Sequence, residues 1–281
     1  MITAIAVFLV VKAVPAIRAD QSNFLTTLQW NPDGARPSFG IAALAFGSVL
    51  SSAIALLLAV PVAVGVSLFT SHYAPRGVAR PLGYVVDLLA AVPSVVFGLW
   101  GLFYLVPHLV PLSRFLNRYL GIIPVFASDG TYGKSLLAAS VVLAVMVLPI
   151  VAAVSREVFL QVPRDQIEAA LALGATRWEV TRTAVLPYGR SGVIAAAVLG
   201  FGRAIGETIA VAMVLSANYQ INIHILEPSG NTIAANIANR YGEAGAIGRG
   251  ALIASGLVLF AITLVVSFGA RAIIQRRRTA T

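Results

Sequence analysis

The sequence predicts an all-α membrane protein with six transmembrane helices. Two observations support this fold class. Only 11% of the 281 residues are charged, against about 25% in an average soluble domain. The apolar residues also occur in unbroken blocks, with a mean hydropathy of +0.87, whereas soluble amphipathic helices intersperse apolar with polar residues. We therefore expect lipid to be the main solvent of this chain.

A helix needs about 20 predominantly apolar residues to cross the hydrocarbon core of a bilayer. We expect spans at residues 2–17, 41–70, 82–110, 135–155, 191–215 and 248–270. The second and third segments are too long for a straight crossing, because about 30 helical residues reach about 45 Å. They must tilt, kink or project from the membrane, and Pro61 and Pro93 are the expected kink points.

The first segment has the position of a signal peptide but not its sequence. No basic residue precedes the apolar run, Lys12 interrupts it, and Ala16-Ile17-Arg18 is a poor cleavage site. We therefore expect a retained, N-terminally shortened first helix instead of a cleaved leader.

Basic residues between the apolar blocks predict the orientation. Eleven of them follow the second, fourth and sixth segments, and seven lie on the opposite side. By the positive-inside rule, this bias places both termini and residues 156–190 in the cytoplasm. The net charge of +9 is then explained as membrane-flanking charge next to lipid, which disfavours a nucleic-acid partner.

The expected cytoplasmic loop is patterned as two short helices. Asp165 is the expected N-cap of the first helix, with the glutamate three residues further on as its capping-box partner. Gly174 then interrupts the pattern, as a residue that adopts positive φ would. Thr176 is expected to cap a second helix that ends at Pro187. An amphipathic helix without a partner would explain the Arg and Ala content of the loop, but not this break.

The loop resembles the EAA loop of bacterial ABC-importer permeases. The residues that carry the resemblance are Glu168-Ala169-Ala170, Gly174 and Leu186-Pro187. It implies the type I ABC importer permease fold, with Glu168, Ala169, Ala170 and Gly174 coupling the chain to a nucleotide-binding subunit. ATP and Mg are then bound by that partner, so we expect neither a cofactor nor an ATPase site in this chain.

Residues 27–32, 91–98 and 202–208 extend the resemblance to the PstC-type subunits of phosphate importers. This resemblance implies a multi-pass protein of the bacterial plasma (inner) membrane that forms half of the pathway for inorganic phosphate. The implied partners are a homologous PstA-like permease subunit, a dimer of PstB-like nucleotide-binding subunits and an extracytoplasmic PstS-like phosphate-binding protein. The N-terminus departs from the family, whose members have a fuller first helix.

Two charged residues, Arg203 and Glu207, lie inside the fifth expected span. Four residues apart, they would share one face of a continuous helix and could pair. One interpretation is a structural ion pair that locks two helices together. The other is a pathway site, in which Arg203 binds phosphate through paired N–H groups and Glu207 compensates Arg203 when phosphate is absent. Because one arginine cannot balance a dianion, we expect a second cation from the sister subunit.

The resemblance implies the same pathway role for this charged pair, and we expect Thr208 and Ser94 to join it. Gly202 and Gly206 form a small-xxx-small strip where another helix can pack closely.

Other classes of protein have less support. An ion-coupled secondary transporter or channel is one alternative, and a permease for another oxyanion is a second. A membrane enzyme or metal site is disfavoured, because the chain has no cysteine and its three histidines are scattered. Gly133-Lys134-Ser135 resembles the end of a phosphate-binding loop, but position 128 is Ser and no strand is expected before it. Trp30 is expected at the membrane interface.

Overall fold

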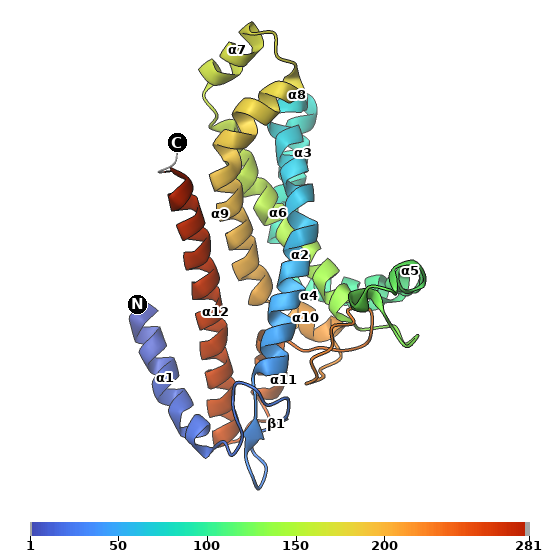
Figure 1. Ribbon diagram of the computed structural model, residues 1–281, viewed down its shortest axis with the longest axis vertical. Coiled ribbons are helices and arrows are strands. Elements are labelled where there is room, and N and C mark those ends of the chain that lie inside the picture. Colours follow the sequence, from blue (N-terminus) through green and yellow to red (C-terminus); the bar gives the residue numbers. More distant parts are fainter. Residues whose placement is uncertain (1, 279–281) are drawn as a thin grey trace. The chain divides into compact units, whose positions relative to one another are not determined.

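The computed structural model describes residues 2–278, without the side chains of Ile2, Arg76 and residues 273–278, and this part of the chain is mostly helical (Figure 1). The elements, in chain order, are α1 (Ile2–Ala19), β1 (Trp30–Asn31), β2 (Ser38–Phe39), α2 (Ala42–Leu68), η1 (Phe69–Tyr73), α3 (Arg76–Ala91), α4 (Ser94–Trp100), η2 (Gly101–Leu105), α5 (Val106–Leu120), η3 (Pro124–Phe126), α6 (Leu136–Leu160), α7 (Arg164–Ala172), α8 (Arg177–Val180), η4 (Thr181–Val185), α9 (Leu186–Ile205), α10 (Ile209–Val214), α11 (Ile233–Arg240) and α12 (Ala246–Arg278).

Five helical stretches of the described residues are long and apolar enough to cross a membrane. They are Ala42–Tyr73, Ser94–Leu120, Leu136–Leu160, Arg177–Ile205 and Ala246–Ala272. The all-helical membrane class is therefore confirmed. The count of six spans is not, because α1 covers the first expected span but is not among these five.

The chain divides into two compact units. The first comprises the chain up to Ala55 together with Pro93–Leu143 and Ala204–Val265. The second comprises Leu56–Val92, Ala144–Arg203 and the chain from Val266 onward. Four of the long helical stretches thus contribute residues to both units.

The core of the first unit is built around Phe39, which is fully buried. β1 and β2 pair antiparallel, with Trp30 opposite Phe39, and the two rings meet edge to face at 5.9 Å. Trp30 also stacks on Tyr219 at 6.2 Å. Trp30 is thus a half-buried packing residue, and its place at the membrane interface stays a prediction. Nearby, the buried Ser48 hydroxyl accepts a hydrogen bond at 2.9 Å from the backbone N–H of Ile233, so the start of α11 is held against α2.

The second unit packs α9 against α6 through glycines. A Cβ atom at Gly200 would lie 2.6 Å from a methyl group of Val147 and 2.9 Å from one of Val151. Elsewhere in this unit, the buried Ser67 hydroxyl donates to the carbonyl oxygen of Ala152 at 2.8 Å and so connects α2 to α6. At Gly202, unlike at Gly200, an added Cβ atom would have nothing within 4 Å. The close helix approach expected at Gly202 therefore occurs at Gly200 within this chain.

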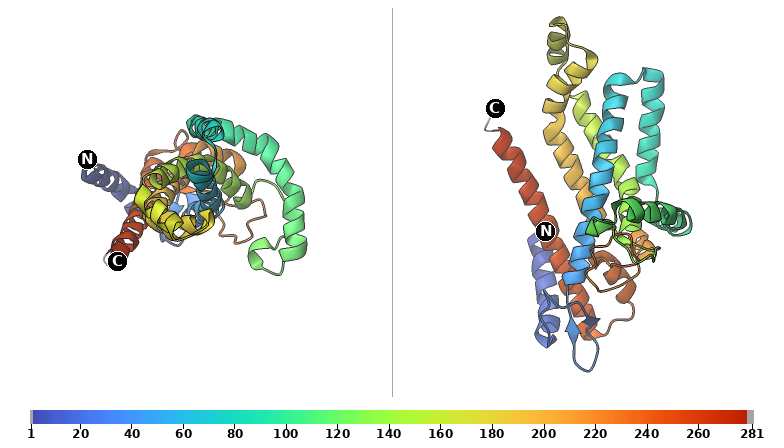
Figure 2. Two further views of the ribbon diagram at one scale, coloured as in Figure 1. Left: turned by 90° about the horizontal axis from the view of Figure 1, so that it is seen from above. Right: turned by 45° about the vertical axis from the view of Figure 1, so that its right-hand side comes forward.

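The third expected span, residues 82–110, is two helices and not one. α3 ends at Ala91, and Pro93 adopts an extended backbone (φ −60°, ψ 140°) before α4 begins at Ser94. Proline lacks the N–H that a continuing helix requires, which favours a break at this expected kink point, whereas α2 continues through the other one, Pro61. In the view from above, the stretch from α4 to α5 runs across the page, whereas α2 is seen close to end-on (Figure 2).

Three π-helical turns stand immediately before prolines. In each turn, the residue before the proline donates its N–H to the carbonyl of the first residue of the turn. The prolines concerned are Pro75, Pro107 and Pro187. A proline ring clashes with the carbonyl four residues earlier, and a wider turn relieves that clash. Helical structure therefore continues through Pro107 and Pro187.

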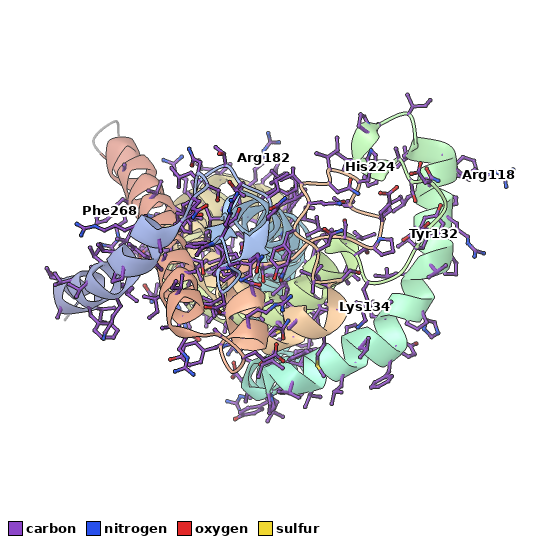
Figure 3. All side chains as sticks on the ribbon, turned by 90° about the horizontal axis from the view of Figure 1, so that it is seen from below. Arg118, Tyr132, Lys134, Arg182, His224 and Phe268 are labelled. Carbon is purple, nitrogen blue, oxygen red and sulfur yellow. The ribbon has the colours of Figure 1, made fainter. Side chains whose placement is uncertain are left out.

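Two loops of the first unit lie beside α5, and Tyr132 and His224 mark them in Figure 3. The Asn117 amide of α5 donates to the Tyr132 hydroxyl at 3.0 Å. Glu227 joins the two loops, because one carboxylate oxygen accepts the backbone N–H of Asp129 at 3.0 Å. Its other oxygen lies 3.5 Å from Nδ1 of His224. A single carboxylate therefore fastens these two segments together.

Candidate translocation pathway and coupling loop

The segment expected to couple to an ATPase subunit, residues 156–190, is called the coupling loop below. It contains two short helices as expected, but its first helix begins differently. Pro163, and not Asp165, occupies the N-cap of α7, and no side chain caps this end. Asp165 lies inside the first turn, where its negative charge still opposes the positive end of the helix dipole. The expected capping box at Asp165 is therefore wrong, because proline is well suited to starting a helix and moves the boundary upstream.

Gly174 has φ +83°, which confirms the positive φ expected from the sequence. Its N–H donates to the carbonyl of Leu171 at 2.9 Å, and the next N–H, of Ala175, donates to the carbonyl of Ala170 at 3.2 Å. These two bonds form the Schellman arrangement that ends a helix. Glycine is required here because other L-residues are strained at this φ.

Thr176 caps the second helix of the loop, as expected. Its hydroxyl accepts the N–H of Glu179 at 3.3 Å, and the Glu179 carboxylate accepts the Thr176 N–H at 2.7 Å. A capping box thus exists in the loop, eleven residues after the expected one. The second helix does not end at Pro187, because η4 absorbs the proline and the helix continues to Ile205.

The loop is anchored by an apolar cluster on its inner side. Phe159, Val162 and Val185 are buried together, and Ile167 of α7 packs against them. The Tyr73 hydroxyl adds a hydrogen bond of 2.8 Å to the Thr181 hydroxyl. These contacts fix the position of the loop relative to the rest of the second unit.

The outer side of the loop presents apolar groups that have no cover within this chain. Leu173 is 90% exposed and Trp178 is 60% exposed. Glu168 and Ala169 are exposed beside them, and Ala170 is half-buried. Large apolar side chains that protrude next to charged ones are typical of a protein-binding surface.

Arg203 and Glu207 do not lie on one continuous helix. α9 ends at Ile205, and α10 begins at Ile209. The Glu207 N–H bonds to the carbonyl of Ala204, a tight turn that ends the helix. The shared helical face expected for this pair is therefore wrong. Gly206 explains the break, because glycine is a poor helix former.

The structure divides the four expected pathway residues between the two units. Glu207, Thr208 and Ser94 belong to the first unit, and Arg203 belongs to the second. Glu207 is only 7% exposed, and the N–H of Ala210 approaches its carboxylate at 3.5 Å. Thr208 precedes α10, and Ser94 begins α4; both are half-buried.

α4 and α10 pack closely in the first unit. A Cβ atom at Gly98 of α4 would lie 2.9 Å from the Cα atom of Ala210 in α10. Ser94, Glu207 and Thr208 are therefore carried by elements in direct contact, whereas Arg203 is exposed on α9.

Arg203 lines a cavity of about 630 Å³ within the second unit. Its walls come from α6, α9 and the last part of α12, and most of the lining residues are aliphatic. Arg271 of α12 lines the same cavity. Arg271 was expected only as a membrane-flanking charge, and no spacing in the sequence relates it to Arg203, 68 positions earlier.

The family described as "Binding-protein-dependent transport system inner membrane component" matches residues 62–279 of this chain. The chain belongs to this family. It is 51% identical to the phosphate transport system permease protein PstC 2 of Mycobacterium tuberculosis, over 96% of this chain and 85% of that protein. It is 42% identical to the phosphate transport system permease protein PstC of Xylella fastidiosa, over 93% of this chain and 81% of that protein.

Solved structures share the fold of this PstC-family permease. An inward-facing structure of the MetNI methionine ABC transporter matches 82% of this permease and 93% of that chain, with a TM-score of 0.57 and 17% identity. An amino acid ABC transporter structure matches 84% of this permease and 92% of that chain, with a TM-score of 0.55 and 17% identity. The ABC-importer permease fold implied by the loop is therefore confirmed.

Membership of the family defines the kind of molecule. The permease is a multi-pass component of the inner membrane and works with an ATPase subunit and a binding protein. It is a transmembrane component without ATPase activity of its own.

Proposed function

We propose that this permease forms one half of the translocation pathway of an ATP-driven importer for inorganic phosphate. The observation that supports this most strongly is its 51% identity to a phosphate transport permease over 96% of the chain. The expected partners are a PstA-like second permease, a dimer of PstB-like ATPase subunits that bind ATP and Mg, and a PstS-like phosphate-binding protein. Both termini of the permease face the cytoplasm.

The coupling loop receives the work of ATP hydrolysis in this proposal. Its outer face, with Glu168, Ala169, Leu173 and Trp178, docks on the ATPase subunit, because these groups are exposed and mixed apolar and charged. The Schellman turn at Gly174 holds the two loop helices at a fixed angle. A rigid loop can transmit a movement of the partner to α9, with which it is continuous.

Arg203 is the proposed contact for phosphate in the pathway. A guanidinium is always charged, and its planar fork donates to two phosphate oxygens at once. Glu207, Thr208 and Ser94 are the other proposed pathway residues, Glu207 with a negative charge and the other two with hydroxyl groups. A pathway must bind its substrate weakly enough to release it, and a carboxylate near the route opposes tight capture.

The proposal is tested by phosphate uptake into proteoliposomes that contain the assembled importer. We expect unlabelled phosphate to compete with labelled phosphate and an equal concentration of sulfate to leave uptake unchanged. Competition by sulfate as strong as that by phosphate would favour a broader oxyanion importer.

Arg203→Lys tests the bidentate contact, because it keeps the charge and removes the fork. We expect uptake to fall at least about tenfold in this variant, since charge-assisted paired hydrogen bonds contribute more than a point charge. Near-normal uptake by Arg203→Lys would refute the bidentate contact of Arg203, but it would not contradict phosphate as the transported substrate.

A further inference from the structure

The cavity beside Arg203 contains a second cation from the same chain. Arg203 of α9 and Arg271 of α12 both line it, together with the hydroxyl-bearing Ser267 and the small Gly202. The remaining lining residues are aliphatic or alanine. Among the described residues that line the cavity, none is acidic.

Two guanidinium groups beside one mainly apolar wall repel each other, and the residues that line the cavity offer them no counter-charge. Such charges are normally compensated by a partner or by a ligand. Because this cavity supplies no acidic group of its own, its lining is complementary to an anion.

We infer that Arg203 and Arg271 together form a binding site for a phosphate group within this cavity. Each guanidinium fork can donate to two oxygens, and a phosphate ion has four. Two positive charges also match the two negative charges of the dianion. For free phosphate as the occupant, this inference rests on the proposed transport function, and it places a second cation for phosphate in this chain.

The space beside Arg203 is left open by Gly202. A Cβ atom at this position would meet nothing within 4 Å, so no neighbouring side chain of the unit fills it. The Ser267 hydroxyl can donate one further hydrogen bond to an oxyanion, and it can accept one from a protonated phosphate oxygen.

A phosphate group can reach this cavity from two sources. One is the transported ion, and the other is the headgroup of an anionic phospholipid, whose acyl chains would cover the aliphatic wall. The arginine chemistry is the same for both sources. The two sources are distinguished by whether the effect of an arginine substitution on transport depends on the lipid composition.

The first arm of the test measures phosphate uptake and ATP hydrolysis by the assembled importer in two lipid mixtures. One contains phosphatidylcholine alone, and the other also contains phosphatidylglycerol. Arg271→Gln should lower the phosphate taken up per ATP hydrolysed at least about tenfold, and Arg271→Lys should lower it less. Arg249→Gln is the matched control, because Arg249 is an exposed arginine of the same helix that does not line this cavity.

A defect of equal size in both mixtures identifies transported phosphate as the occupant. A defect that occurs only with phosphatidylglycerol identifies the lipid headgroup. In that case, native mass spectrometry should find phosphatidylglycerol retained by the wild type and lost from Arg271→Gln. If Arg271→Gln matches the Arg249→Gln control in uptake per ATP and in retained lipid, the two-arginine site is wrong.

The double variant separates a shared site from two independent effects. If both arginines bind the same phosphate group, the double variant Arg203→Gln/Arg271→Gln should take up about as much phosphate per ATP as the more severe single variant. Fully multiplicative losses would contradict a shared site. Wild-type importer that takes up no phosphate would instead refute the proposed function, and the lipid-retention measurement would then decide the site.

Discussion

Replacing Gly174 by alanine should loosen the coupling loop through its backbone alone. Gly174 has φ +83°, and a Cβ atom there would meet nothing within 4 Å. The substitution therefore introduces no clash with a neighbour, and its cost is the strain of a left-handed residue, about 1–2 kcal/mol. That strain corresponds to a factor of about 5–30 in the equilibrium between the formed and the opened turn.

Hydrogen exchange of the loop measures this opening. The amide hydrogens of Gly174 and Ala175 are held by the turn, so their protection should fall by about that factor in Gly174→Ala. Gly174→Asn should lie between wild type and alanine, because asparagine tolerates this φ better. ATP-driven uptake should fall in the same order if the loop is where the ATPase subunit docks.

Gly77→Ala serves as the control, because Gly77 also has open space for a Cβ atom but no positive φ. We expect it to leave the exchange of the loop unchanged. If Gly174→Ala exchanges no faster than Gly77→Ala, or if Gly174→Pro leaves subunit assembly and uptake intact, the assignment of a rigid turn at Gly174 is refuted.

Two further predictions concern helix packing and pH. Gly200→Ala should lower the free energy of unfolding by about 1–3 kcal/mol relative to Gly202→Ala, because only the new methyl group at position 200 would clash with Val147. Both variants gain the same helix propensity, so that term cancels in the comparison. Equal thermal stability of the two variants would contradict the close packing of α9 on α6 at Gly200. Burial raises the pKa of Glu227, but the backbone N–H of Asp129 and other hydrogen bonds and charge outweigh it, so the pKa of Glu227 is lowered overall. Its contribution to holding the Asp129 and His224 loops together is present above pH about 4.5 and is lost as pH falls through the lowered pKa. Acid should therefore increase hydrogen exchange in these two loops, and Glu227→Gln should abolish that increase. An unchanged pH profile in this variant would exclude the role.

Local signals predicted local structure well. Gly174 is expected to end a helix because it stands between two helix-forming runs. Thr176 is expected to cap the start of the second helix because it directly precedes it. Both expectations hold. Pro93 likewise marks a real break. At Gly174 and Thr176 a single residue type determines the backbone within one turn, so no tertiary information was needed.

The expectations that failed depend on several residues acting together. Pro187 does not end its helix, because the preceding turn widens to five residues and absorbs the ring. Arg203 and Glu207 have the spacing of one helical face, but the chain leaves the helix between them. Spacing alone cannot distinguish a continuous helix from one that stops after Ile205.

Arg271 was missed as a candidate site residue for a different reason. It follows a long apolar block, which is where a flanking arginine is normally found. Only the packing of α9 beside the end of α12 brings it to the cavity that Arg203 lines. Long-range contacts of this kind leave no periodic signal in a single sequence.

The central claim is that this permease moves phosphate only when an ATPase subunit drives it. It is tested most directly by reconstituting the permease with its sister permease and binding protein, with and without the ATPase subunit, and measuring phosphate uptake. We expect uptake only when the ATPase subunit and ATP are both present. Phosphate uptake by the permease alone, driven by a proton or sodium gradient, would contradict the account and identify a secondary transporter.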